Sequence, residues 1–108
     1  MSRDDERDPT GQIVVHIDPD LEDLIPLFME NRQNDIVAIR EALKTGDFNT
    51  VRTLGHSMKG SGGGYGFDSI TTIGAFLEQA AKDADTEGAL RHLEDLVDYV
   101  KRVRVVYD

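Results

Sequence analysis

Cysteine is absent from this chain of 108 residues. The chain can therefore form no disulfide and offers no thiolate as a nucleophile or metal ligand. No apolar run approaches about 20 residues, the length that a membrane-spanning helix needs, and the first ten residues are too charged for a signal peptide. Cations are also scarce, because 12 Lys and Arg stand against 21 Asp and Glu and leave a formal charge of -9. Nucleic acid and anionic membrane surfaces would repel such a chain. We expect a single small cytoplasmic domain whose partners are proteins.

The N-terminal part of the chain differs in composition from the rest. Residues 1–12 are charged and include proline and glycine, so we expect a disordered tail. Ile13–Ile17 is apolar and β-branched, and we expect an extended arm that lies against the helices without a pairing strand. Asp18 or Asp20 can cap a short helix that begins at Leu21. The folded domain is therefore predicted over residues 13–108, with its core at about 21–107.

Four long helices are predicted after this extension. The first is expected from Pro26, because proline is tolerated in a first turn. Gly46 and Asp47 combine a stop signal with the N-cap of the next helix, which is predicted over about 48–61. The polar stretch Glu30–Asp35 is expected to be a solvated part of the first long helix. The start signals of the two remaining helices are Asp68 and Thr86.

Apolar residues recur every three or four positions in these segments, as on the buried face of a helix. The connections are short, so consecutive helices should be antiparallel neighbours. The predicted fold is all-α, an antiparallel up-down-up-down four-helix bundle with a short additional N-terminal helix and the extended arm. The last helix is expected to continue almost to the C-terminus. Its apolar positions are Leu90, Leu93, Val97, Val100, Val103 and Tyr107.

His56 is the candidate reactive residue. Each residue advances about 100° around a helix, and His56 then lies roughly 150° from the apolar sector that holds Val51 and Met58. The imidazole is therefore predicted to face solvent. Lys59 at i+3 and Arg52 at i-4 are within side-chain reach of it.

Glycines surround this histidine at positions where a helix would prefer other residues. Gly60 and Gly63 are predicted on the same helical face as His56, although glycine in a helix costs about 1 kcal/mol relative to alanine. With Arg52 they should border a surface that another protein approaches closely. An imidazole is partly neutral and nucleophilic near neutral pH, and Lys59 could stabilise a phosphoryl group added to it. The sequence leaves open which ring nitrogen reacts.

The segment His56-Ser57-Met58-Lys59-Gly60, with Gly66 ten residues after the histidine, resembles the H-x-x-K-G-x-x-x-x-x-G signature of histidine phosphotransfer (HPt) domains. The resemblance covers the chain from about Leu21 onward. The three consecutive glycines Gly62–Gly64 and the N-terminal arm are not required by that pattern. Similar residues elsewhere are Phe28, Gly46-Asp47, Leu77-Glu78 and Ala80-Ala81.

The resemblance implies a phosphoryl carrier without autonomous kinase activity. Its partners would be response-regulator receiver domains and a hybrid or sensor histidine kinase, and phospho-His56 would relay the group between receiver aspartates. The receiver would bring Mg²⁺, so the chain is expected to need no cofactor or metal of its own. Lys59 is implied as the charge-stabilising residue, Gly60 as the position that admits the receiver, and Gly66 as a tight turn.

Binding sites of other kinds fit the sequence less well. The glycine run Gly60–Gly66 superficially suggests a phosphate-binding loop, but a P-loop ends in Gly-Lys-Ser/Thr and here Lys59 precedes the glycines. His16, His56 and His92 lie on separate predicted elements, so the sequence gives little support for a zinc site.

Two other signalling roles are alternatives. The dimerisation domain of a sensor kinase usually has an acidic residue after the histidine and a proline soon afterwards, whereas this chain has Ser57 and no proline beyond Pro26. An adaptor that docks receivers or kinases without relaying phosphate is the other alternative, and the presence of both His56 and Lys59 argues against it. A monomer is expected, although the Ile13–Ile17 arm could pair with a second copy.

Overall fold

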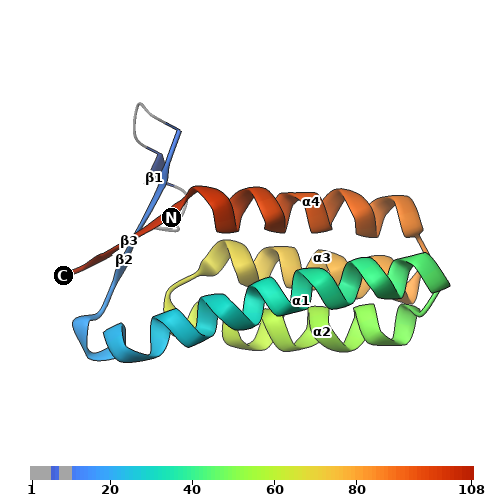
Figure 1. Cartoon of the computed structure of the whole chain (residues 1–108), viewed down its shortest axis with the longest axis horizontal. Coiled ribbons are helices and arrows are strands. Elements are labelled where there is room, and N and C mark those ends of the chain that lie inside the picture. The colour runs from blue at the N-terminus through green and yellow to red at the C-terminus, as the bar shows by residue number, and fades with distance from the viewer. Residues whose placement is uncertain (1–5, 8–10) are drawn as a thin grey trace.

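The computed structural model describes residues 6–7 and 11–108, with four helices packed side by side and a small sheet at one end (Figure 1). The all-α bundle predicted from the sequence is confirmed. In chain order the elements are β1 (Glu6–Arg7), β2 (Ile13–Ile17), η2 (Pro19–Leu24), α1 (Ile25–Thr45), α2 (Phe48–Ser61), η3 (Gly63–Tyr65), α3 (Asp68–Lys82), α4 (Thr86–Arg102) and β3 (Val103–Tyr107).

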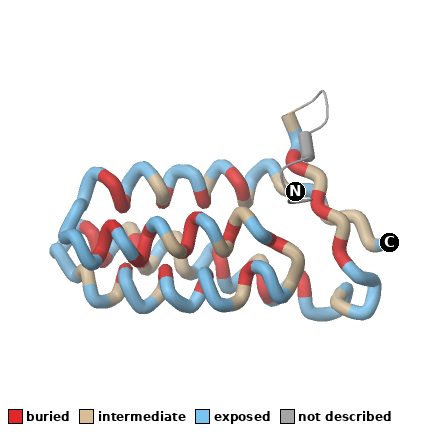
Figure 2. Tube along the Cα trace, turned by 180° about the vertical axis from the view of Figure 1, so that it is seen from behind, coloured by how far each residue is buried: buried red, intermediate tan, exposed pale blue. Residues whose placement is uncertain are grey.

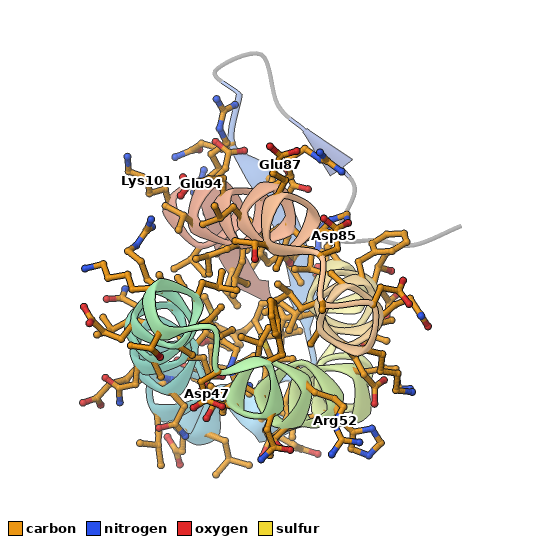
Figure 3. All side chains as sticks on the ribbon, turned by 90° about the vertical axis from the view of Figure 1, so that its right-hand side faces the viewer. Asp47, Arg52, Asp85, Glu87, Glu94 and Lys101 are labelled. Atoms are coloured by element: carbon orange, nitrogen blue, oxygen red, sulfur yellow. The ribbon has the colours of Figure 1, made fainter. Side chains whose placement is uncertain are left out.

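The helices form a closed ring around one core. Each packs against the next in sequence, and α1 also packs against α4. Seen end-on, side chains from all four helices fill the space between them (Figure 3), and the buried positions recur along each helix (Figure 2). Burial of such a side chain contributes about 1.5–3 kcal/mol. Large side chains that are almost fully buried are Ile39, Val51, Met58, Phe67, Ile70, Leu77, Leu93 and Leu96.

The signals for the first helices act as their local chemistry predicts. The Asp18 carboxylate accepts a hydrogen bond from the backbone N–H of Asp20, but the short helix is a 3-10 helix that begins at Pro19, two residues earlier than expected. Pro26 lies in the first turn of α1, and Gly46 ends that helix in the left-handed conformation at φ 72°. The predicted stop of α1 is thus confirmed, whereas the helix begins at Ile25, one residue before the predicted start.

The caps of the next three helices are partly as predicted. Asp47 caps α2, and its carboxylate accepts a hydrogen bond from the backbone N–H of Thr50 at 3.1 Å. The predicted caps Asp68 and Thr86 are wrong by one residue each, because both are the first residue of their helix. Phe67 occupies the N-cap of α3 without a side-chain hydrogen bond. Asp85 caps α4, because its carboxylate accepts a hydrogen bond from the backbone N–H of Gly88, the third residue of the helix.

The C-terminal end of the chain differs from the prediction. α4 ends at Arg102, and Val103–Tyr107 form β3, which pairs in parallel with β2 from Ile13↔Val103 to Ile17↔Tyr107. The predictions of a helix to Tyr107 and of an arm without a pairing strand are both wrong. β-branched valines favour strand conformation, and the two apolar segments satisfy each other's backbone groups once they lie side by side.

The sheet closes one end of the bundle. The side chains of Ile13, Val15 and Ile17 point inward and are at most 3% exposed. On its other edge β2 pairs antiparallel with β1. Much of the tail predicted to be disordered, residues 1–5 and 8–10, lies outside the described residues.

The polar stretch on α1 is not fully solvated as predicted. Arg32 is 8% exposed, and its guanidinium lies 4.7 Å from the centre of the Phe28 ring. Its Nε donates to the Asp35 carboxylate at 2.9 Å. Burial of a guanidinium is tolerable when it is paired and stacked in this way.

Among the helices that the structure describes, none combines the length and apolar character of a membrane span.

Candidate functional site

His56 lies near the middle of α2 and faces away from the core. Its side chain is 70% exposed, whereas Val51, Gly55 and Met58 on the inner side of the helix are buried. The helical phase predicted this outward direction correctly. A partner protein can therefore reach the imidazole without any rearrangement of the bundle.

A carboxylate from the neighbouring helix holds the imidazole in place. Glu78 of α3 has a side chain that is only 10% exposed, and its Oε2 lies 2.8 Å from Nδ1 of His56. Its other oxygen, Oε1, lies 2.7 Å from Nζ of Lys59. Lys82, one turn further along α3, has its Nζ 4.0 Å from Oε2. Both oxygens of this carboxylate therefore face cationic or hydrogen-bonding groups.

The charge state of Glu78 determines which proton the imidazole carries. The hydrogen bond from Lys59 lowers the pKa of Glu78 below its ordinary value, and the bond from His56 acts in the same direction, against the opposing effect of burial. An ionised carboxylate can only accept hydrogen bonds. Nδ1 of His56 must then be the donor, and in a neutral ring Nε2 carries the free lone pair.

Lys59 lies on α2 three residues after His56, and its ammonium forms an ion pair with Glu78, the carboxylate that also contacts the imidazole. Its influence on His56 therefore passes through the shared carboxylate. Lys59 is 42% exposed, so its side chain can also move toward a negative charge that arrives at the surface.

Arg52 and Lys82 border a small pocket beside the imidazole. The pocket has a volume of about 290 Å³, and Thr53, His56 and Glu78 complete its lining. Arg52 projects outward from α2 (Figure 3). Its Nη2 donates to the side chain of Asn49, one turn earlier, at 3.2 Å. The histidine is thus flanked by cations, although the chain as a whole is acidic.

The glycines that were assigned to a docking surface lie in different environments. Gly60 is exposed on α2, and a Cβ added to it would meet no atom of the described residues within 4 Å. Gly63 does not share the helical face of His56, because α2 ends at Ser61 and the chain turns into η3. Its N–H donates to Oγ1 of Thr71 at 2.7 Å. Gly66 has φ 94°, a conformation that a tight turn requires and glycine adopts easily.

Glu78 and Lys82 are the residues whose part in the site sequence reasoning missed. Glu78 was noted only as part of a resemblance. One signal was available, because the helical period places this charged residue on the buried face of α3 beside Leu77 and Ala81. A charge is seldom buried without a partner, so a cation or imidazole from another helix should have been sought. Lys82 follows at i+4 on the same face.

The other histidines lie outside this site. Nδ1 of His16 on β2 lies 2.8 Å from the Asp108 carboxylate, and the ring of His92 on α4 stacks on Phe76 of α3. Among the side chains described for residues 11–108, no three His, Asp or Glu are grouped so that they could hold a metal ion.

Comparison with known proteins identifies the family of the chain. The family model of the Hpt domain matches residues 23–105, a range that contains His56, Lys59 and Glu78. No curated protein and no solved structure matches the chain. Because the matched range covers most of the chain and nearly all of the four-helix bundle, the chain belongs to the Hpt domain family, which serves histidine phosphotransfer in phosphorelay signalling.

Proposed function

We propose that His56 carries a phosphoryl group on Nε2 and relays it between the aspartates of receiver domains. The observation that carries this assignment is the 2.8 Å contact between Nδ1 and Glu78. It engages one ring nitrogen and leaves the other as the nucleophile, on an imidazole that is 70% exposed.

The transfer step follows from this arrangement. The lone pair of Nε2 attacks the phosphorus of an aspartyl phosphate, the bond from phosphorus to the aspartate oxygen breaks, and the aspartate leaves as a carboxylate. The ring gains positive charge as the new N–P bond forms, and its Nδ1–H remains directed at Glu78. A negative charge at that distance stabilises the charged ring, as in other sites where a carboxylate orients a catalytic histidine. The reverse attack, by a receiver aspartate on phospho-His56, returns the group.

The surroundings of the ring suit the charge of the product. Arg52, Lys59 and Lys82 contribute three positive charges near Glu78, which contributes one negative charge. A phosphoryl group carries about 1.5 to 2 negative charges near neutral pH. Because the ring also gains positive charge in the transfer, the arrival of the phosphoryl group would offset most of the local excess of positive charge.

A receiver domain is the partner that this surface fits best. The exposed glycine at position 60 leaves the surface one turn from His56 without a side chain, so another backbone can come close. In this proposal the receiver supplies the aspartate and the Mg²⁺, a hybrid or sensor histidine kinase supplies the phosphoryl group, and the bundle acts as a cytoplasmic monomer without kinase activity of its own.

Incubation with a phosphorylated receiver tests the proposal. The protein should acquire an acid-labile, alkali-stable phosphate, and ³¹P and ¹⁵N NMR of the product should place it on Nε2. A His56→Gln variant with the circular dichroism spectrum of the original protein should remain unlabelled. Equal labelling of that variant would refute the assignment of His56. Tight receiver binding without transfer in either direction would favour the adaptor role.

A further inference from the structure

The backbones of α2 and α3 come into direct contact beside His56, at two glycines that face each other. A Cβ added to Gly55 would lie 2.7 Å from the backbone nitrogen of Glu78 and 2.8 Å from the carbonyl oxygen of Gly74. One added to Gly74 would lie 2.6 Å from the backbone nitrogen of Lys59 and 2.7 Å from the carbonyl oxygen of Gly55. Neither position has room for any other residue while the helices keep this separation.

A third glycine extends this contact to the end of α2. Gly62, seven residues after Gly55, would place a Cβ 2.7 Å from the backbone nitrogen of Thr71 and 2.8 Å from the carbonyl oxygen of Phe67. We call Gly55, Gly62 and Gly74 the glycine seam.

Other glycines of the same region have no such constraint. A Cβ on Gly60 or Gly64 would meet no atom of the described residues within 4 Å, and neither has a positive φ. The seam is therefore a specific set of positions and not a general property of this glycine-rich stretch.

Gly55 and Gly74 of the seam lie against the backbone of residues of the candidate site. Gly55 directly precedes His56, and it meets the backbone of Glu78, while Gly74 meets the backbone of Lys59. Carbon atoms in ordinary contact are about 3.5–4.0 Å apart, so a methyl group at Gly74 would separate the two helices by about 1 Å. The hydrogen bond between His56 and Glu78 is 2.8 Å long, and a contact lengthened to about 3.6 Å or more is no longer a hydrogen bond.

We propose that the glycine seam is a positioning element. It holds α3 so close to α2 that the Glu78 carboxylate reaches Nδ1 of His56, and it thereby fixes the tautomer that leaves Nε2 free. The consequence for phosphotransfer rests on the function proposed above, whereas the effect on the imidazole does not.

The Gly74→Ala variant tests this directly, because it changes neither α2 nor any side chain of the site. Circular dichroism should first show that the helices are retained. The ¹⁵N shifts of the His56 ring, measured where the ring is neutral, should show the Nδ1–H tautomer in the original protein and a shift toward Nε2–H in the variant. Transfer from a phosphorylated receiver should slow by between about ten- and a hundredfold, the range expected for a misplacement of about 1 Å. The matched control is Gly64→Ala, which should leave both measurements unchanged.

The outcomes separate the two proposals. An unchanged tautomer in folded Gly74→Ala would overturn the seam proposal, whatever the transfer rate. If Gly74→Ala shifts the tautomer but the original protein accepts no phosphoryl group from the receiver, the seam proposal is supported and the proposed function is refuted.

A second variant serves if Gly74→Ala does not fold. Glu78→Asp keeps the seam and the charge but shortens the side chain by one methylene, which withdraws the carboxylate by about 1.5 Å. The same loss of the Nδ1–H tautomer should follow. Retention of that tautomer by Glu78→Asp would show that the separation of the helices does not control the imidazole, and would overturn the proposal.

Discussion

Replacement of Glu78 by glutamine tests the electrostatic part of the site with almost no change in shape. The carboxylate now receives the Nδ1–H of His56 at 2.8 Å and the ammonium of Lys59 at 2.7 Å. A glutamine amide can donate as well as accept, so it no longer selects one imidazole tautomer, and it offers no negative charge to the ring during transfer. Hydrogen bonds to a charged group are roughly twice as strong as neutral ones. Water competes at an imidazole that is 70% exposed, so we expect the low end of such effects, a loss of about tenfold in transfer rate.

Rapid-quench kinetics with a phosphorylated receiver would measure this loss, together with the ¹⁵N shifts of the His56 ring. Glu87→Gln is the matched control, because it removes the same charge from α4, across the bundle from Arg52 (Figure 3). That control should transfer at the original rate. If Glu78→Gln also transferred at the original rate and kept the Nδ1–H tautomer, the carboxylate would not be what orients the ring, and the reasoning from its ionisation would be wrong.

Three further predictions concern stability. Because the pKa of Glu78 is lowered in the folded protein, the ionised carboxylate stabilises the fold fully above pH 4.5, its ordinary pKa, and this contribution is lost as the pH falls through the lowered pKa. Urea titrations from pH 7 to pH 3 should show this loss of unfolding free energy. Glu78→Gln should lack it. Gly66→Ala should destabilise by about 2 kcal/mol, since its φ of 94° disfavours a side chain and the new Cβ would lie 2.6 Å from Ile17 Cδ1; an unchanged urea midpoint would contradict this. Asp35→Asn should cost about 2–3 kcal/mol in the same assay, because it leaves the Arg32 guanidinium, on a side chain that is 9% exposed, without its ionised partner.

The parts of the fold that the sequence predicted are those set by neighbouring residues. Gly46 and Asp47 end one helix and begin the next, because a left-handed glycine and a capping carboxylate act within one turn. The outward direction of His56 follows from the helical period alone. These features depend on contacts between residues only a few positions apart in the chain, so they can be predicted from the sequence.

The C-terminal strand shows where that reading fails. The valines of Val103–Tyr107 fit an apolar spacing of three to four, typical of a helix, and also an alternating spacing, typical of a strand. The β2 segment, about 90 residues earlier, favours the strand, because it supplies a hydrogen-bonding partner for a strand and not for a helix. The prediction that Gly63 shares the helical face of His56 failed for a related reason. α2 ends at Ser61, and the N–H of Gly63 donates to Thr71 on the next helix.

The sequence by itself determined a four-helix bundle with an exposed histidine in a phosphotransfer signature. Only the tertiary structure decided which groups surround that histidine. It paired Lys59 with Glu78 and brought Glu78 to Nδ1 of His56, the contact on which the proposed role of Nε2 as the nucleophile rests. The physical reason is one of range. Helical phase and caps arise from residues within a turn of each other, whereas the imidazole–carboxylate distance depends on how closely two helices pack. The backbones of the two helices are in contact where Gly55 meets Gly74, and we propose that this contact sets their separation. These residues are 19 positions apart, and their spacing in the chain gives no sign of the contact.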